Sequence, residues 1–154
     1  MPIHTLTAQQ IIPATLEQAW EFFSNPRNLA TITPPDLGFE IMTPDLPKRI
    51  RAGLMIEYRV RPLLGIPATW LTEITHVQEG ASFVDEQRVG PYAIWHHEHG
   101  FRDLGDGRVE LLDRVTYRLP FQPFGDLVHG LLVQPRLASI FAFRKTKVEE
   151  LFPS

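Results

Sequence analysis

The first residues of the chain change from a strand pattern to a helix pattern. Residues 4–12 are strand-like and stop at Pro13. Thr15 and Gln18 then have the spacing of a capping box, in which a threonine and a residue three positions later cap a helix start reciprocally. An amphipathic helix is expected to follow, because apolar residues recur at the helical spacing i, i+3, i+4 and i+7: Leu16, Ala19, Trp20 and Phe23.

Two further helical segments are predicted. Asn25 and Pro26 can open a second short helix, as its cap and first residue, and this helix should end near Pro34. In the last third, charged residues such as Arg144 lie mostly off an apolar stripe. Pro135 lacks an amide and clashes with the preceding turn, so it predicts a kink, or two helices with the longer one starting near it. The stripe consists of Leu127, Leu131, Leu137, Phe141, Val148 and Leu151.

Between residues 38 and 119 the hydrophobic period becomes two, which is typical of strands. Short connections with turn residues separate these strands, and such connections join antiparallel neighbours. The order of one strand, two short helices, about six strands and a long helix predicts an α+β fold. In that fold a curved antiparallel sheet wraps around the C-terminal helix. The clearest strands are residues 54–61, 68–78, 82–89, 93–103 and 108–119.

The last strand has two distinct faces. Asp113 lies on the apolar face, together with Val109, Leu111, Val115, Tyr117 and Leu119. We expect that face to point at the core, where an unpaired carboxylate would be costly. The opposite face is expected to be solvated and carries Arg108, Glu110, Arg114, Thr116 and Arg118.

The preceding strand supplies partners for this carboxylate. A three-residue loop at 105–107 would place His99 opposite Asp113. A loop two residues longer would place His97 there instead, and both registers keep the inner faces together. With five residues between Arg88 and Ile94, Asp85 falls opposite His97. Trp95, Phe101 and Tyr117 would flank these pairs.

Three interpretations of the inward His–Asp pairs remain open. They can be satisfied structural pairs that fix the sheet register. They can be the polar anchor of a pocket with apolar walls. They can also serve chemistry, since a His held by a carboxylate works as a general base, and His-x-His with a carboxylate can ligate a divalent metal. The chain shows no nucleophile elbow and no Gly-rich phosphate loop.

Two loops are unusually apolar, residues 62–67 and 120–124. They can fold over the end of the sheet as core. They can instead rim a pocket mouth, or touch a membrane or a partner surface.

Composition narrows the class of protein. With 154 residues, 44% of them hydrophobic, the chain fits a single domain over 1–154 with a sizeable core. The net charge of −3 and the lack of a concentrated basic face argue against a nucleic-acid partner. The absence of cysteine excludes disulfides and Cys-based zinc sites. Neither a secretory signal nor a stretch approaching 20 apolar residues is present, so we expect a cytoplasmic protein without stable membrane insertion.

The motifs together resemble those of the START-like (SRPBCC) superfamily, and within it the bacterial polyketide-cyclase-like ligand-binding proteins. The residues that carry the resemblance are Phe83-x-Asp85-x-Gln87, Gly90-Pro91-Tyr92, Trp95-x-His97-x-His99-x-Phe101 and Asp113-x-Val115-x-Tyr117-x-x-Pro120. The resemblance implies a helix-grip fold, with seven antiparallel strands around the C-terminal helix and two short helices after the first strand. Relatives bind lipids, sterols, polyketides or plant hormones, and a minority catalyse cyclisation or hydrolysis.

We therefore expect a small hydrophobic ligand, lipid-, polyketide- or isoprenoid-like, in a cavity between sheet and helix, with no cofactor and no metal. One alternative is a cyclase, dehydratase or hydrolase that uses an inward His–Asp pair, with His97, His99 and Asp113 as candidates. Another is a regulatory module that docks a protein partner, whose identity the sequence does not give. The expected ligand-binding residues are Tyr58, Asp85, Gln87, Trp95, His97, His99, Phe101, Asp113 and Tyr117.

Overall fold

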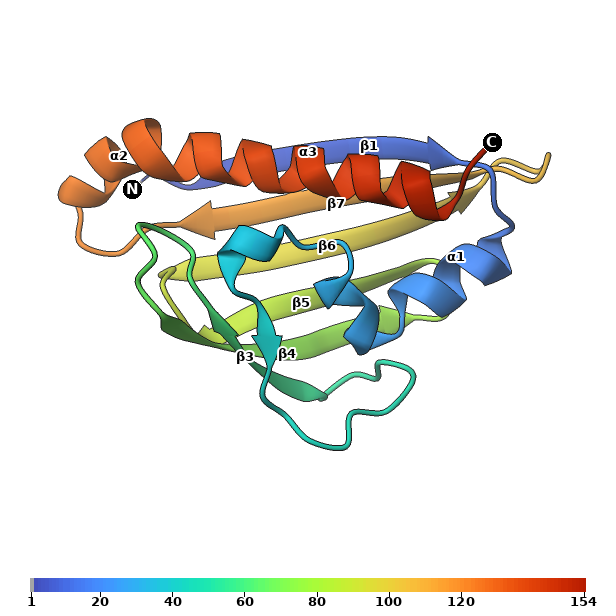
Figure 1. The fold of residues 1–154 in the computed structure, drawn as a ribbon, viewed down its shortest axis with the longest axis horizontal. Coiled ribbons are helices and arrows are strands. Elements are labelled where there is room, and N and C mark those ends of the chain that lie inside the picture. The colour runs from blue at the N-terminus through green and yellow to red at the C-terminus, as the bar shows by residue number, and fades with distance from the viewer. Residues whose placement is uncertain (1) are drawn as a thin grey trace.

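A computed structural model describes residues 2–154 (Figure 1). The chain forms a strand, one α-helix, two short 3₁₀ turns, six more strands and a long C-terminal helical segment. These elements are β1 (His4–Ile12), α1 (Leu16–Phe23), η1 (Pro26–Ala30), η2 (Pro35–Leu37), β2 (Glu40–Ile41), β3 (Met55–Val60), β4 (Ala68–Gln78), β5 (Ser82–Val89), β6 (Ile94–Asp103), β7 (Val109–Arg118), α2 (Phe124–Val128), η3 (His129–Val133) and α3 (Gln134–Leu151).

The strands form one antiparallel sheet in the order β1-β7-β6-β5-β4-β3-β2. The first strand therefore pairs with the last, and the chain's middle builds the rest of the sheet by successive neighbours. Helix α3 runs along β1 and β7 on one side of the sheet, and α1 lies near the C-terminal end of α3 (Figure 1). This arrangement is the expected α+β helix-grip fold, and it is confirmed.

The capping box at the first helix is also confirmed. The Gln18 amide N–H donates to Thr15 Oγ1 at 3.1 Å, and the Thr15 amide N–H donates to Gln18 Oε1 at 2.9 Å. Asn25 caps the next segment by accepting from the Arg27 amide N–H at 3.1 Å. That segment is a single 3₁₀ turn rather than a helix reaching Pro34, and a second 3₁₀ turn follows it.

The C-terminal helical segment changes its winding just before Pro135. Residues His129–Val133 form a π-helical turn, and α3 starts directly after it at Gln134. Pro135 thus occupies the first turn of α3, where its missing amide removes no bond from within that helix. The predicted division near Pro135 is confirmed.

The short-loop register between β6 and β7 is confirmed. The Leu104 amide N–H donates to the Arg108 carbonyl at 2.9 Å, and His99 lies opposite Asp113. The alternative register, with His97 opposite Asp113, is wrong. Between β5 and β6, Asp85 lies opposite His97, as predicted.

One residue of the expected solvated face is buried. Glu110 is 5% exposed, and it accepts hydrogen bonds from Gln9 Nε2 and from Arg102 Nε, the latter at 2.9 Å. Its carboxylate is covered because β1 and β6 flank β7 on both sides. The prediction that Glu110 lies on a solvated face is therefore wrong.

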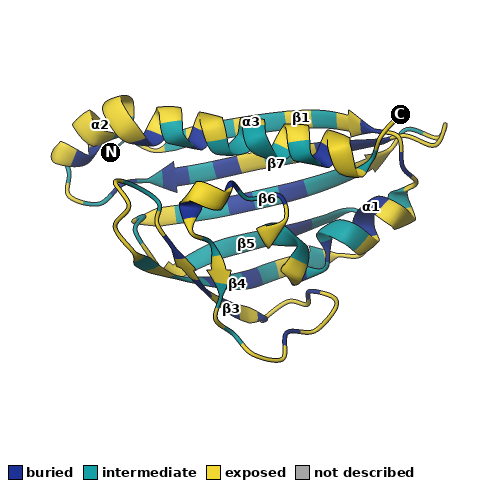
Figure 2. Ribbon diagram, viewed as in Figure 1, coloured by how far each residue is buried: buried dark blue, intermediate teal, exposed yellow. Residues whose placement is uncertain are grey.

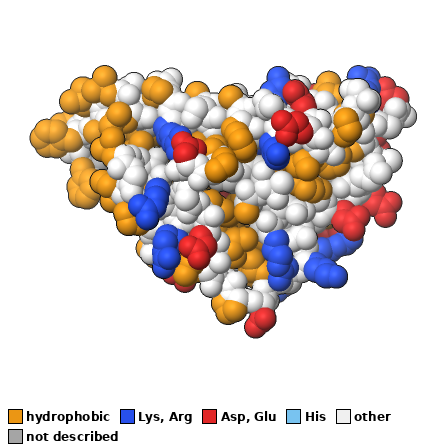
Figure 3. Space-filling view, viewed as in Figure 1, with side chains coloured by type: hydrophobic (Ala, Val, Ile, Leu, Met, Phe, Trp, Pro, Cys, Tyr) orange, Lys and Arg blue, Asp and Glu red, His pale blue; other side chains and the backbone are white. Residues whose placement is uncertain are grey.

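The apolar loops do not all fold inward. Pro62 and Leu63 line the interior, but Leu64 is 78% exposed and Phe121 is 83% exposed. Exposed apolar side chains gather at the end of the molecule that carries α2 (Figure 3). The interpretation of these loops as pure core is therefore wrong for their tips.

The core lies between the inner face of the sheet and the helices. Buried and partly exposed residues alternate along the central strands (Figure 2), as a strand with one covered face requires. No helix within residues 2–154 is both long and apolar enough to cross a membrane.

Candidate functional site

A cavity of about 210 Å³ lies between the sheet, α3 and the short helices after β1. Its size follows from the fold, because a strongly curved sheet and a helix laid across it leave a gap that the side chains fill only in part. Lining residues come from helices α1 and α3 and from strands β3, β4, β5 and β6, whereas β1 and β7 supply none. We consider this cavity the candidate site.

The cavity walls are mostly aromatic and aliphatic. Trp70 and Trp95 meet edge to face, with ring centroids 5.2 Å apart. The Trp70 indole N–H donates to Thr72 Oγ1 at 3.0 Å, which satisfies its polar atom. Tyr58 is buried on the same wall; burial, and then the charge of Asp85, raise the pKa of its hydroxyl. Leu137 and Phe141 close the cavity from α3.

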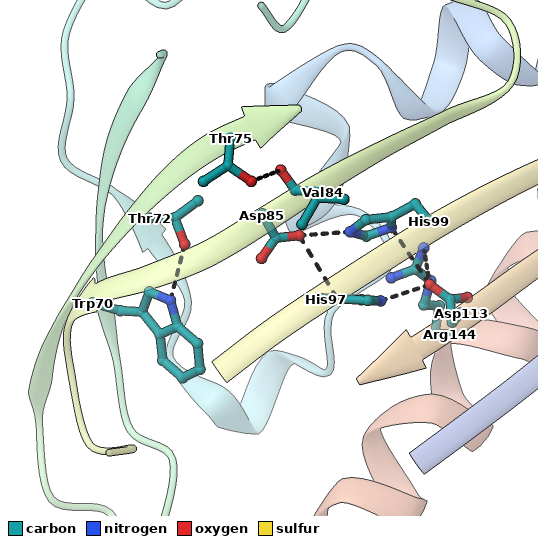
Figure 4. Close-up of polar contacts among 9 residues, drawn as sticks. All are labelled: Trp70, Thr72, Thr75, Val84, Asp85, His97, His99, Asp113 and Arg144. Carbon is teal, nitrogen blue, oxygen red and sulfur yellow. Dashed lines mark hydrogen bonds and ion pairs between the residues drawn. The ribbon is translucent and has the colours of Figure 1, made fainter. Parts of the chain in front are cut away.

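The polar end of the cavity is a cluster that we call the His–Asp ring, consisting of Asp85, His97, His99 and Asp113 (Figure 4). His97 Nε2 donates to Asp113 Oδ1 at 2.8 Å, and His99 Nε2 donates to Asp85 Oδ2 at 2.5 Å. The two imidazoles stack with centroids 3.7 Å apart. Their side chains are less than 10% exposed.

The hydrogen bonds of the His–Asp ring do not join residues that lie directly opposite each other in the sheet. The sequence predicted Asp85 with His97 and His99 with Asp113, because those residues lie opposite each other. The shorter contacts are the diagonal ones, since diagonal neighbours across two strands are within reach of long side chains. The register was correctly predicted and the hydrogen-bond partners were not.

Arg144 completes the polar end, and the sequence prediction missed it. Its guanidinium Nη2 lies 3.4 Å from Asp113 Oδ1, and its side chain is 15% exposed. A signal was available in the sequence. Leu137, Phe141, Arg144 and Val148 recur at three- and four-residue spacing, so Arg144 lies on the inner stripe of the helix.

Burial and neighbouring groups shift the pKa values of the two carboxylates in opposite directions. Burial by itself would raise the pKa of Asp113, but Arg144, followed by the His97 hydrogen bond, holds that pKa below its ordinary value. Burial would likewise raise the pKa of Asp85, but its hydrogen bond to His99, followed by the electrostatic influence of His97, His99 and Arg144, holds that pKa low. Both carboxylates are therefore ionised at neutral pH.

His99 behaves as a neutral group. Burial and the neighbouring His97 lower the pKa of His99 to about 4, against the opposing effect of Asp85. The cluster thus presents two carboxylates and one guanidinium, with at least one uncharged imidazole between them.

Five expected ligand-binding residues line the cavity, and four do not. Tyr58, Asp85, Trp95, His97 and His99 line it. Asp113 lies behind the imidazoles, and the remaining three are engaged elsewhere, as described next.

Gln87, Tyr117 and Phe101 are held by other groups. The Gln87 side chain accepts from the Tyr92 amide N–H at 3.0 Å and donates to the Tyr92 carbonyl at 2.7 Å, so it fixes the β5–β6 turn. The Tyr117 hydroxyl bonds His129 Nε2 at 2.7 Å. Phe101 packs with Trp20 and other aromatic rings of the core. These residues shape the fold around the cavity and do not face it.

No protein-family model matches this chain, and no curated protein matches it. Solved structures do match over nearly the whole chain. A START superfamily protein from Mycobacterium smegmatis is 14% identical, with 94% of this chain and 99% of that chain covered and a TM-score of 0.63. Norcoclaurine synthase from Thalictrum flavum is 14% identical, with 97% and 88% covered and a TM-score of 0.66.

Major latex-like protein 151 from Panax ginseng is 12% identical, with 99% of both chains covered and a TM-score of 0.69. Identities this low establish the fold alone. The chain accordingly has the START-like helix-grip fold that its sequence motifs predicted.

Proposed function

We propose that the protein binds a compact, largely apolar molecule that carries one polar group. The supporting observation is the cavity itself, which has mostly apolar walls and a polar end formed by Asp85, His97, His99 and Arg144. A few convergent polar groups among apolar walls are the usual composition of a small-molecule site. The apolar walls supply affinity and the polar end fixes the orientation of the ligand.

The size of the cavity favours a ring system over a long acyl chain. Its volume of about 210 Å³ is below the roughly 300–1,000 Å³ of drug-sized sites. The aromatic walls at Trp70 and Trp95 offer faces and edges on which a flat ring can pack. The structure of norcoclaurine synthase is a complex with dopamine and hydroxybenzaldehyde, which are small aromatic molecules. A polyketide- or isoprenoid-like ring compound is therefore our preferred ligand class.

The first test is native mass spectrometry of the freshly purified protein, repeated after denaturation. We expect an extra mass of a few hundred daltons that is released on unfolding. A titration with naphthalene and 2-naphthol, followed by tryptophan fluorescence, then tests the orientation of the ligand. The hydroxyl should strengthen binding by up to about tenfold, because a hydrogen bond contributes about 0.5–1.5 kcal/mol.

Two variants on one strand make the test specific. His97 faces the cavity, whereas His96 faces the other side of the sheet and contacts Glu86 at 2.5 Å. His97→Ala should remove the preference for 2-naphthol, and His96→Ala should keep it. Equal binding of the two compounds by the wild-type protein, or binding of neither, would contradict the proposal.

The polar end also favours a second candidate, an enzyme that transfers a proton inside the cavity. Asp85 is an ionised carboxylate that lines the cavity, and a carboxylate in that position can act as a general base. A bound cyclic ketone such as 1-tetralone should then exchange its α-protons in D₂O, as followed by proton NMR. Exchange that persists unchanged in Asp85→Asn would exclude this role.

A further inference from the structure

We propose that Asp85, His97 and His99 form a binding site for a divalent transition metal at the polar end of the cavity. The sequence alone led us to expect no metal. The proposal rests on the geometry of the His–Asp ring and does not depend on the organic ligand proposed above.

Three ligand atoms already converge on one point. Asp85 Oδ2 lies 2.5 Å from His99 Nε2 and 3.7 Å from His97 Nδ1, and one ligand atom from each residue lies within 4.8 Å of the other two. Atoms bound tetrahedrally to one zinc ion at about 2.0–2.2 Å are roughly 3.3–3.6 Å apart. Small side-chain movements therefore suffice: the His99–Asp85 contact opens by about 1 Å and the His97–Asp85 contact closes slightly.

The second imidazole nitrogen of each histidine faces Asp113. Asp113 Oδ1 lies 2.8 Å from His97 Nε2 and 3.4 Å from His99 Nδ1. Each imidazole thus has one nitrogen toward Asp85 and the other toward Asp113. His97 already donates from the nitrogen on the Asp113 side, whereas His99 would bind the metal in its other tautomer, with the proton on Nδ1 toward Asp113. Metal-bound histidines almost always donate their second N–H to a carboxylate, which fixes the ring and leaves the first nitrogen as the ligand. Asp113 is placed for this supporting role.

The positions of the two carboxylates relative to the cavity separate them in the same way. Asp85 and both histidines line the cavity, whereas Asp113 lies behind them. Arg144 Nη2 lies 3.4 Å from Asp113 Oδ1, so this guanidinium contacts the supporting carboxylate. Within residues 2–154, no ion pair shorter than 4 Å joins Arg144 to Asp85, the carboxylate that would bind the metal. The site is thereby open toward the cavity.

The donor set selects the class of metal. Two imidazole nitrogens and one carboxylate suit Zn²⁺ or Fe²⁺, whereas Mg²⁺ and Ca²⁺ prefer oxygen ligands alone. Three protein ligands leave at least one position free, which is the arrangement of sites that bind an exogenous group. Asp85 and Asp113 together with Arg144 carry one net negative charge, so a divalent ion makes the cluster positive. An anionic oxygen, such as hydroxide or a phenolate, would balance that charge.

The test is isothermal titration of the whole, chelator-treated protein with Zn²⁺ in the absence of any organic ligand. We expect one equivalent to bind. Asp85→Ala and His99→Ala should each weaken binding at least 100-fold, because each removes a ligand. Asp113→Asn should weaken it about 10- to 100-fold and keep the stoichiometry, as expected for a supporting carboxylate.

His96→Ala is the matched control, because His96 and Glu86 form a His–carboxylate pair on the opposite face of the same strands. It should leave zinc binding unchanged. Loss of binding in His96→Ala, with binding kept in His99→Ala, would overturn the proposal and assign the zinc to the outer face. Failure of the wild-type protein to bind zinc at millimolar concentration would overturn it as well.

Folding defects in the variants are handled by a measurement on the wild-type protein alone. Zinc should shift the imidazole ¹⁵N resonances of His97 and His99 and leave those of His96 in place. Shifts confined to His96 would overturn the proposal. Because no organic ligand is present, these results are independent of the naphthol titration and of the function it tests.

Discussion

At the scale of single residues, alternation along the strands predicted the members of the polar cluster, but not their contacts. A period of two places Asp85, His97, His99 and Asp113 on inner faces, and all four lie there. The diagonal hydrogen bonds depend on how each side chain leans along its strand, which alternation does not specify. Arg144 was missed because its charge was taken as a sign of exposure.

Arg144 should be important for stability, because it contacts a buried carboxylate. Arg144→Met leaves Asp113 without its cation, and breaking a buried pair in this way costs about 3–5 kcal/mol. We expect a loss near the lower end of that range in urea unfolding of the chelator-treated protein at pH 7. Arg114→Met is the control, because its side chain is 64% exposed and lies 3.9 Å from Glu98; it should change stability by less than about 0.5 kcal/mol.

The same variant should show a specific pH dependence. In the wild-type protein the pKa of Asp113 is below its ordinary value, so its stabilising contribution is present at neutral pH and declines as the pH falls below about 4. Without Arg144 the burial of Asp113 dominates and raises its pKa, so the folded variant takes up a proton at a higher pH. The stability difference between the two proteins should therefore shrink from pH 7 to pH 4. A constant difference would show that Arg144 acts through packing and not through charge.

At the scale of elements, the strands were predicted closely and the exposure of their flanks was not. The fourth strand spans Ala68–Gln78, the range that alternation and its flanking turn signals indicated. Local patterns specify such elements because neighbouring residues share one backbone geometry. The burial of Glu110 and the exposure of Phe121 depend instead on which distant segments cover them, so sequence spacing gave no information about either.

One contact joins two elements across the cavity. Arg136 of α3 donates to Asp36 Oδ2 of η2 at 2.8 Å, and Arg136 also lines the cavity. An exposed pair of this kind contributes about 0.2–1 kcal/mol. If the pair resists separation of α3 and η2, Arg136→Ala should speed ligand dissociation about 1.5- to 5-fold, as measured by stopped-flow tryptophan fluorescence with 2-naphthol.

A comparison with a second exposed pair isolates that effect. Arg49 and Glu79 form an ion pair at 3.2 Å, and neither residue lines the cavity. Arg49→Ala should leave the dissociation rate unchanged. Added salt should speed dissociation from the wild-type protein and have little effect on Arg136→Ala, since salt screens exposed pairs. A rate insensitive to both Arg136→Ala and salt would show that ligand leaves by another route.

At the scale of the whole molecule, the fold was predictable, and a cavity was expected from the architecture and the resemblance, but its dimensions were not. The order of elements and the motifs on β5, β6 and β7 indicated a helix-grip architecture, which the structure has. The volume and shape of the cavity depend on packing between α3, the short helices and strands far apart in sequence. Hydrophobic periodicity reports which face is inside, but not whether the inside is filled.

A cavity in the core can be filled by mutation, and this separates ligand binding from stability. Val60 is buried on β3 and lines the cavity, so Val60→Phe places a ring in the space proposed for the ligand. Because the volume is already present, the added ring should not cause the 1–3 kcal/mol loss typical of overpacking a filled core. We expect unfolding stability within about 1 kcal/mol of wild type, and affinity for 2-naphthol reduced at least tenfold.

The control is Val89→Phe, because Val89 is 53% exposed at the end of β5 and lies outside the cavity. It should leave affinity unchanged. Weaker binding in Val60→Phe at unchanged stability would place the ligand inside the molecule, because a ligand held on the exposed apolar surface near α2 would not be displaced. Unchanged affinity in Val60→Phe would assign the ligand to that outer surface. A loss of more than about 2 kcal/mol would instead mean that the wall at Val60 is already closely packed.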